Sequence, residues 1–238
     1  MFCYQCEQTK GGTGCTEVGV CGKDARTAAM QDLLLYAVKD ISRFAHRASQ
    51  IGAKDRATDR FVIDALFATV TNVDFDPLRL QELVRQAAAV RQRAVALYVG
   101  AARRSGRKVE ELEEKTSWWT KVNDPVALAG IAEALRITKR TETLGPDVTG
   151  LQELITYGLK GSAAYVDHAS ILGREDEEVY GFFLETLDYL TRRPTDVNEL
   201  VGKVLKVGEV NLKVMGMLDA ANTGAYGTRR RRRSASRR

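Results

Sequence analysis

The sequence has little proline: 4 of its 238 residues. Because proline interrupts helices, this scarcity permits long helices and excludes a collagen-like or proline-rich chain. The sequence also lacks an apolar run near the ~18 residues that a membrane-spanning helix needs, the longest run being residues 33–38. No secretory leader pattern precedes the first cysteine at position 3. We therefore expect a soluble, cytoplasmic protein.

Several common catalytic patterns are absent as well. The sequence contains no G-x-x-x-x-G-K-[ST] phosphate loop, no G-x-G-x-x-G dinucleotide motif, no G-x-S-x-G nucleophile motif and no H-E-x-x-H zinc motif. Only two histidines occur, His46 and His168, and each is interpreted as a surface or packing residue because no cysteine or carboxylate partner accompanies it. Any chemistry must therefore come from another part of the sequence.

No cysteine occurs after residue 21. All four lie at the N-terminus, as Cys3, Cys6, Cys15 and Cys21, with the spacing C-x2-C-x8-C-x5-C. Disulfides are typical of secreted chains, and nothing here indicates secretion. Four thiols crowded into so short a segment therefore indicate a metal centre.

Zinc and an iron–sulfur cluster compete for this centre. Structural zinc sites usually pair two short C-x2–4-C hooks separated by a dozen or more residues, whereas these cysteines are unevenly spaced. An iron–sulfur cubane places one thiolate at each of four separated corners, which suits uneven spacing. Nearby glycines would let the backbone approach the cluster. The spacing favours iron–sulfur, with zinc second and unligated thiols third.

The positive charge is confined to the C-terminus. The net charge is +5, but residues 229–238 contain seven arginines, so the rest of the chain carries a small net negative charge. An arginine-rich segment binds polyanions whatever its purpose. We therefore expect only nonspecific nucleic-acid binding from this tail.

The rest of the sequence has a helical period. Apolar residues recur every three to four positions, and no long alternation indicates a sheet, so we predict an all-α fold of two consecutive three-helix bundles. Helix starts are predicted at Asp24, at Thr58 or Asp59, at Pro77 and at Pro125. The predicted helices of the second half cover residues 125–139, 148–172, 175–190 and 196–218. The predicted segments are a cysteine-rich loop (1–23), a first bundle (24–102), a linker (103–124), a second bundle (125–221) and a C-terminal segment (222–238).

Four short motifs carry a family resemblance. The chain opens Met1-Phe2-Cys3-Tyr4-Gln5-Cys6-Glu7-Gln8-Thr9, continues with Gly14-Cys15-Thr16 and Gly19-Val20-Cys21-Gly22-Lys23, and reaches Asn222-Thr223-Gly224-Ala225-Tyr226-Gly227. This pattern resembles the hybrid-cluster proteins, also called prismane proteins or hydroxylamine reductases. The resemblance implies that Cys3, Cys6, Cys15 and Cys21 bind a [4Fe–4S] cubane. It also implies a first domain of two three-helix bundles.

The family's chemistry takes place at a second site. Its members reduce hydroxylamine to ammonia, and have been linked to nitric oxide and nitrosative stress, at a hybrid iron–sulfur–oxygen cluster held by two later α/β domains. Family chains are more than twice this length, and their first hybrid-cluster ligand is a histidine where this sequence has Thr228. We therefore expect a truncated chain that relays electrons from a redox donor protein, lacks the hybrid cluster and the missing domains, and is inactive alone.

A different class of protein uses the same residues. A zinc-stabilised helical binding module would employ the four cysteines structurally and the arginine tail for nucleic acid. Metal content separates the two hypotheses, because an iron–sulfur protein contains acid-labile sulfide and a zinc protein does not.

Overall fold

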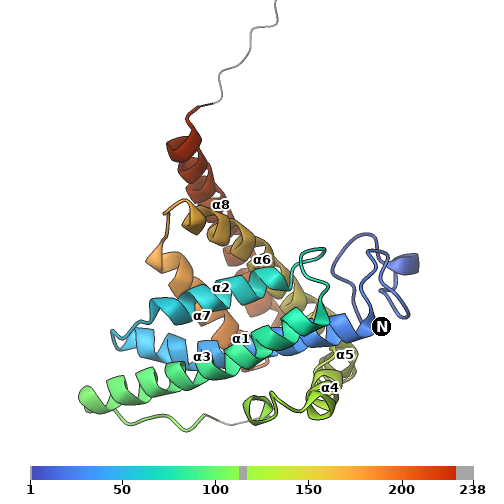
Figure 1. Ribbon diagram of the computed structural model, residues 1–238, viewed down its shortest axis with the longest axis horizontal. Coiled ribbons are helices and arrows are strands. Elements are labelled where there is room, and N and C mark those ends of the chain that lie inside the picture. Colours follow the sequence, from blue (N-terminus) through green and yellow to red (C-terminus); the bar gives the residue numbers. More distant parts are fainter. Residues whose placement is uncertain (1, 113–116, 229–238) are drawn as a thin grey trace, which may run out of the picture.

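The computed structural model describes residues 2–112 and 117–228. In these ranges the chain forms eight α-helices, two short 3-10 helices and one isolated bridge between residues 3 and 15, with no named strand. Figure 1 shows α1, α2, α3 and α7 gathered in the body of the molecule, while α8 rises away from it. The all-α prediction is confirmed.

The first helices begin at capping residues. Asp24 accepts a hydrogen bond from the Thr27 amide and opens α1 (Ala25–Gln50), and Asp76 precedes Pro77 at the start of α3 (Pro77–Arg104). Carboxylates at this position satisfy amides that lack a helical partner. The start predicted at Thr58 or Asp59 is wrong: α2 (Arg56–Ala68) begins earlier because Asp55 caps it, accepting from the Ala57 amide.

The second half differs from the prediction in two places. The helix predicted over residues 125–139 is two helices, α4 (Pro125–Ala134) and α5 (Ile137–Leu144), because the backbone is extended at Arg136 (φ −54°, ψ 147°). The remaining helices are α6 (Pro146–Ile171), α7 (Glu177–Thr191) and α8 (Val197–Tyr226). α8 thus continues beyond the predicted end at residue 218.

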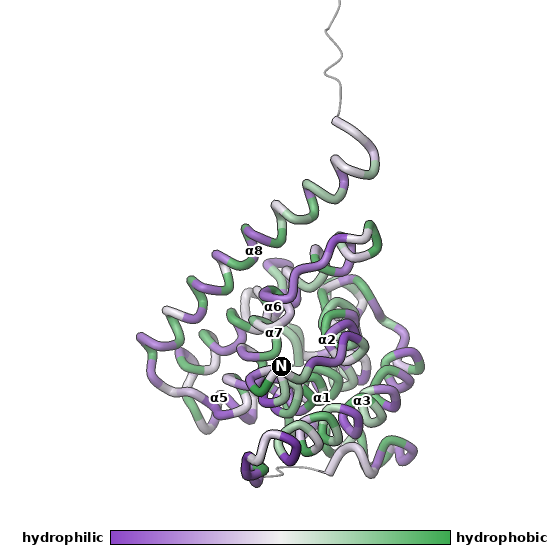
Figure 2. The backbone as a smooth tube through the Cα atoms, turned by 90° about the vertical axis from the view of Figure 1, so that its left-hand side faces the viewer, coloured by the Kyte–Doolittle hydropathy of each residue, from purple (hydrophilic) through white to green (hydrophobic). Residues whose placement is uncertain are grey.

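One apolar core joins the two halves. α1 packs against α2, α3, α4 and α7, and α6 packs against α2, α5 and α8. Fully buried side chains from both halves, including Leu34, Ile41 and Ile63 in the first and Leu159 and Leu187 in the second, belong to a single cluster. In Figure 2 apolar segments likewise meet where α1, α3 and α7 lie together. The three-helix groups therefore share their core.

The segment between the halves is anchored. Trp118, in the 3-10 helix Trp118–Thr120, is fully buried and donates its indole N–H to Asp40 Oδ2 at 3.2 Å. Arg91 Nε donates to the same carboxylate oxygen at 2.7 Å, and its guanidinium lies over the Trp119 ring. This buried network ties the connection to α1 and α3.

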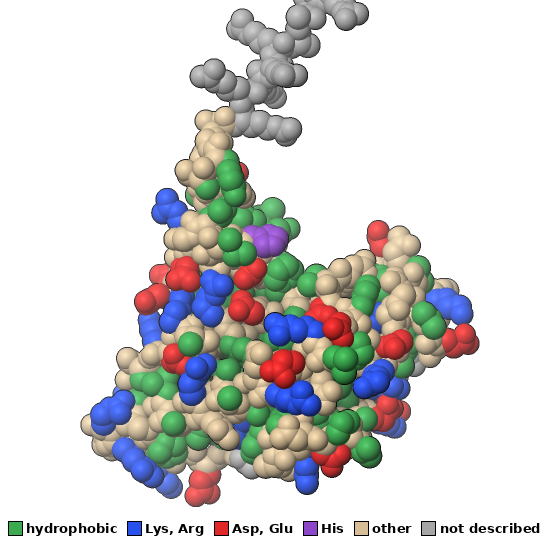
Figure 3. All heavy atoms as spheres, viewed as in Figure 1, with side chains coloured by type: hydrophobic (Ala, Val, Ile, Leu, Met, Phe, Trp, Pro, Cys, Tyr) green, Lys and Arg blue, Asp and Glu red, His purple; other side chains and the backbone are tan. Residues whose placement is uncertain are grey.

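The surface is mixed in charge, and α8 also exposes apolar side chains. Figure 3 shows Lys, Arg, Asp and Glu side chains interspersed over the viewed face. α8 exposes large apolar side chains, among them Leu205, Leu212 and Tyr226. No helix within the described ranges has the length and hydropathy that crossing a membrane requires. The predicted arginine-rich tail (229–238) lies outside the described residues.

Candidate metal centre

The four cysteines lie on one N-terminal segment, residues 2–23, which we call the cysteine loop. Its two arms meet where the Cys15 amide donates to the Cys3 carbonyl at 2.6 Å and the Phe2 amide donates to the Cys15 carbonyl at 2.8 Å. All four thiols are free, with Cys15 buried and the other three half-buried. Figure 1 shows the loop at the end of the body where α1 begins.

The backbone closes tightly around Cys21. The Gly19 amide donates to the Lys23 carbonyl at 2.7 Å, and the Gly22 amide donates to the Gly19 carbonyl at 2.8 Å. A Cβ atom at Gly19 would lie 3.0 Å from the Lys23 carbonyl oxygen and 3.3 Å from Cys21 Sγ. Glycine at position 19 therefore lets the main chain approach the sulfur more closely than a side chain would allow.

The donor set fits an iron–sulfur cluster by its chemistry. Four thiols come from one segment, no disulfide uses them, and Gly19 leaves space beside Cys21. However, within residues 2–112 and 117–228 no group of three or more His, Cys, Asp or Glu side chains is arranged to hold a metal ion. The four cysteines thus lie on one loop without being gathered around a common point.

Apolar contacts hold the loop against the helices. Phe2 is buried and forms, with Cys15 and Ala28 of α1, a small cluster separate from the main core. The Tyr4 ring meets the Tyr157 ring of α6 edge to face at a centroid distance of 5.9 Å. The loop is therefore docked on α1 and α6.

Two buried lysines reinforce this docking. Lys23 Nζ donates to Gln31 Oε1 at 2.6 Å, and Gln31 Nε2 in turn donates to the Asp74 carbonyl at 2.8 Å. Lys160 Nζ of α6 donates to Gln5 Oε1 and to the Thr69 carbonyl, each at 3.3 Å. Both lysines are almost fully buried, and neither forms an ion pair with another described residue. Positive charge is thus concentrated beneath the cysteine loop.

Carboxylates compensate this charge incompletely. Burial raises the pKa of Asp32 to about 6, against the opposing effect of Lys160. Burial also lowers the pKa of Lys160 to about 8, although Asp32 acts in the opposite direction. Burial raises the pKa of Glu153, but Arg140, whose Nη2 lies 2.6 Å from the carboxylate, acts together with Lys39 and Lys160 to leave the pKa below its usual value. Burial raises the pKa of the Cys3 thiol, while Lys23 opposes the rise.

Sequence reasoning found the cysteines but missed the lysines. Lys160 occupies a position among the buried apolar residues of α6, where Leu159 and Ala163 are fully buried. A lysine among the buried apolar residues of a helix is uncommon, and this feature of the sequence could have indicated that Lys160 is buried.

The two histidines lie away from the cysteines and contact other side chains. His168 packs edge to face on Phe67, and His46 Nε2 lies 3.1 Å from Gln50 Nε2.

Comparison with known proteins gives consistent matches. The chain matches the model of the Prismane/CO dehydrogenase family over residues 1–237. It is 48% identical over 227 residues to a hydroxylamine reductase of Rhodospirillum rubrum and 44% identical over 231 residues to one of Acidithiobacillus ferrooxidans. Each alignment covers 95% of this chain and 41% of the relative. The chain therefore spans well under half the length of these relatives.

Proposed function

This chain belongs to the Prismane/CO dehydrogenase family, and from that membership we propose that Cys3, Cys6, Cys15 and Cys21 bind a [4Fe–4S] cluster. Family membership implies iron–sulfur binding. The cluster type and its four ligands are the proposal. They rest on one observation: the only four cysteines of the chain are free thiols on a single loop docked on the body.

The surroundings of the loop support a negatively charged occupant. A cluster held by four thiolates carries net negative charge, and Lys23 and Lys160 supply two buried positive charges beneath the loop. Burying an ammonium group without an ion pair is unfavourable. An anionic centre on the loop would offset this cost.

The proposed role is electron transfer. A bound iron–sulfur cluster accepts and releases one electron at a time. The residues of this chain hold it: the four thiols ligate, Gly19 admits the backbone beside Cys21, and Lys23 and Lys160 stabilise the added negative charge. We propose that the chain receives electrons from a redox donor protein.

The proposed destination of the electrons follows from the relatives. The matched proteins are hydroxylamine reductases, of which this chain corresponds to 41% of the length. We propose that the chain is the electron-accepting part of such a reductase, passing electrons to a hybrid cluster where hydroxylamine becomes ammonia. The zinc-module alternative is not favoured, because the family and the curated relatives point to redox chemistry.

Metal and sulfide analysis tests the proposal. The full chain, purified without oxygen, is expected to contain about four iron atoms and about four acid-labile sulfides. The double variant Cys6→Ser/Cys21→Ser should lose both while keeping its helical circular dichroism, and Thr16→Ala, an exposed change in the same loop, should retain both. Zinc without sulfide in the unaltered chain would overturn the proposal.

A further inference from the structure

A second polar site lies away from the cysteines, in a pocket lined by α1, α5, α6, the ends of α4 and α7 and the residues that follow these two ends. Its volume is about 350 Å³, within the range of small-molecule sites. Six lysine and arginine side chains line it, against three aspartates. Part of the wall is apolar, formed by residues such as Leu35, Tyr36 and Leu190.

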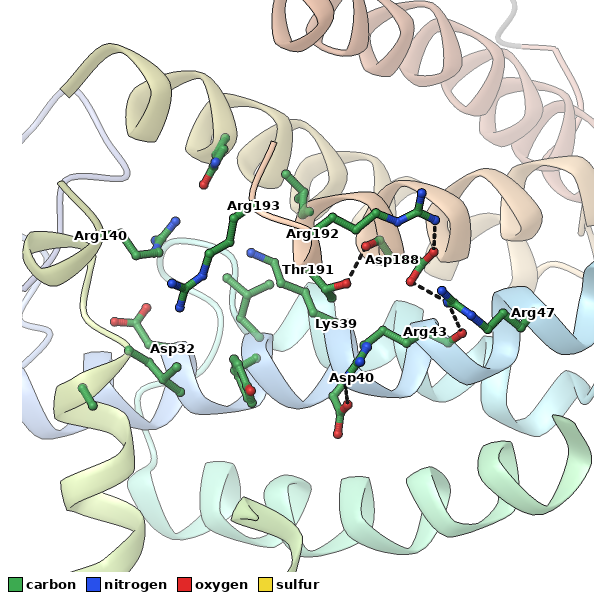
Figure 4. Close-up of a pocket in the computed structure, with 16 residues that line it drawn as sticks. Asp32, Lys39, Asp40, Arg43, Arg47, Arg140, Asp188, Thr191, Arg192 and Arg193 are labelled. Carbon is green, nitrogen blue, oxygen red and sulfur yellow. Dashed lines mark hydrogen bonds and ion pairs between the residues drawn. The ribbon is translucent and has the colours of Figure 1, made fainter. Parts of the chain in front are cut away.

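On one side of the pocket the charges are paired. Asp188 accepts from Arg47 Nη1 at 2.9 Å and from Arg192 Nη2 at 2.6 Å, and Asp40 accepts from Arg43 Nη1 at 3.2 Å. Figure 4 shows these contacts as dashed lines in its right-hand half. Arg47, Arg192 and Asp188 therefore form an internal ion-pair network.

On the other side, two cations make no direct contact with a carboxylate in the described part of the chain. Lys39 of α1 and Arg193, which follows α7, make no side-chain hydrogen bond or ion pair with any other described residue. Figure 4 shows both side chains projecting into the pocket beside Arg140 and Asp32, with no dashed line between them. Burial is the main reason that the pKa of Lys39 falls to about 8. Arg140 acts in the same direction, whereas Glu153 and Asp32 oppose the shift. In this part of the pocket the three cations Lys39, Arg140 and Arg193 thus outnumber the nearby carboxylates, Asp32 and Glu153, of which Glu153 pairs with Arg140.

The backbone at Arg193 is unusual for its residue type. Its φ is +53°, a conformation at a helix C-terminus that favours glycine or asparagine. Gln152 of α6 supports the turn, because its side-chain amide donates to the Pro194 carbonyl at 2.9 Å. The backbone of Arg193 is therefore strained, and its guanidinium points into the pocket. A glycine would relieve that strain but remove the charge.

We propose that this pocket binds a small organic anion, with its carboxylate or phosphate between Lys39, Arg140 and Arg193 and its apolar part against Leu35, Tyr36 and Leu190. Guanidinium groups recognise both oxyanions in a bidentate manner, and an ammonium adds a point charge. The apolar wall selects an organic anion over an inorganic one. The site uses none of the cysteines.

Calorimetric titration of the full chain tests this site. The probes are phenyl phosphate, benzoate, inorganic phosphate and neutral benzyl alcohol. Phenyl phosphate or benzoate should bind saturably, and its affinity should fall at higher salt. Inorganic phosphate should bind at least tenfold more weakly than the better organic probe. The stronger of the two organic probes identifies the oxyanion. No saturable binding by either, or equal binding of benzyl alcohol, would overturn the proposal.

Variants separate the site from general effects. Arg193→Gly and Lys39→Met should each weaken the better probe at least tenfold, while Arg193→Lys should retain part of the affinity. Arg193→Gly should also unfold no more easily than the unaltered chain, since glycine suits φ +53°. The matched controls are Asn72→Gly, the other non-glycine position of positive φ (+64°) among the described residues, and Lys206→Met on α8. Both control variants should bind the better probe with an affinity within twofold of the unaltered chain. If Arg193→Gly and Lys39→Met also bind it as well as the unaltered chain, the proposed site is contradicted.

Discussion

In the helical body, order comes from apolar burial, whereas in the cysteine loop it comes from a few polar anchors. Leu33, Leu34 and Ile41 are completely buried, and aspartates cap α1, α3 and α7. The loop has one isolated backbone bridge, one small apolar cluster and the side-chain contacts of Lys23 and Lys160. A body of the first kind folds without a ligand, while a loop of the second kind would gain a more precise arrangement from a bound cluster such as the one proposed.

The largest expected effect comes from the body. Leu34→Ala removes a fully buried side chain, and the loss of packing should lower the free energy of unfolding by about 2–5 kcal/mol. Chemical denaturation measures this change. Leu205→Ala on α8, where the leucine is 70% exposed, is the control and should stay within about 0.5 kcal/mol. Iron per folded chain should be unchanged in both variants; its loss in Leu34→Ala would mean that the two regions are not separable.

A smaller effect should appear where body and loop meet. Burial raises the pKa of Asp32 from its ordinary value of 3.8 to about 6. Its charged neighbours are Lys160, Glu153, Arg140 and Lys23. The folded state therefore holds the proton more tightly than the unfolded state, and stability falls as the pH rises from about 4 to about 6.

Asp32→Asn removes this titration. The variant should gain stability relative to the unaltered chain over the same pH interval, by on the order of 1–3 kcal/mol. Urea unfolding at pH 4, 5, 6 and 7 measures the difference. A difference that is flat, or that runs in the opposite direction, contradicts the burial of Asp32 as its cause.

The smallest effect should be confined to the loop. Lys160→Met removes the donor to Gln5 and Thr69, and a hydrogen bond of this kind contributes about 0.5–1.5 kcal/mol. Amide exchange in residues 2–23 should therefore accelerate roughly three- to tenfold, with exchange in the helix cores unchanged. The control is Lys203→Met, because Lys203 pairs with Glu185 and both residues are far in sequence from the cysteine loop. This variant should leave amide exchange in the loop unaltered. If amide exchange in the loop accelerates equally in both variants, Lys160 is not an anchor of the loop.

Helix starts were predictable where capping chemistry was unambiguous. Asp24, Pro77 and Pro125 mark the starts of α1, α3 and α4 as expected. Near α2 several acidic and hydroxyl residues follow one another, and only the structure shows that Asp55 is the cap. The break at Arg136 has no proline or glycine beside it, so the local sequence gives no signal for dividing α4 from α5.

At the candidate site the sequence predicts the four cysteines but not the residues that support their loop, and their role as ligands stays a prediction. Cysteine spacing is local information, since all four lie within residues 3–21. The anchors are distant: Lys160 and Gln5 are 155 positions apart, and Lys39 on α1 and Arg193 after α7 reach the same pocket. Such pairings depend on how α1, α6 and α7 pack, which no periodicity specifies. The predicted domain boundaries stay predictions, because the halves share one apolar core.

The most direct test compares amide exchange of the full chain before and after its iron is removed by a chelator. The loop of residues 2–23 should be protected when about four irons are bound and should lose that protection on removal, while the fully buried stretches of α1, α6 and α7 keep theirs. Unchanged exchange of the loop would mean that the cysteines hold no cluster. Loss of protection throughout α1, α6 and α7 would contradict the independence of the helical body.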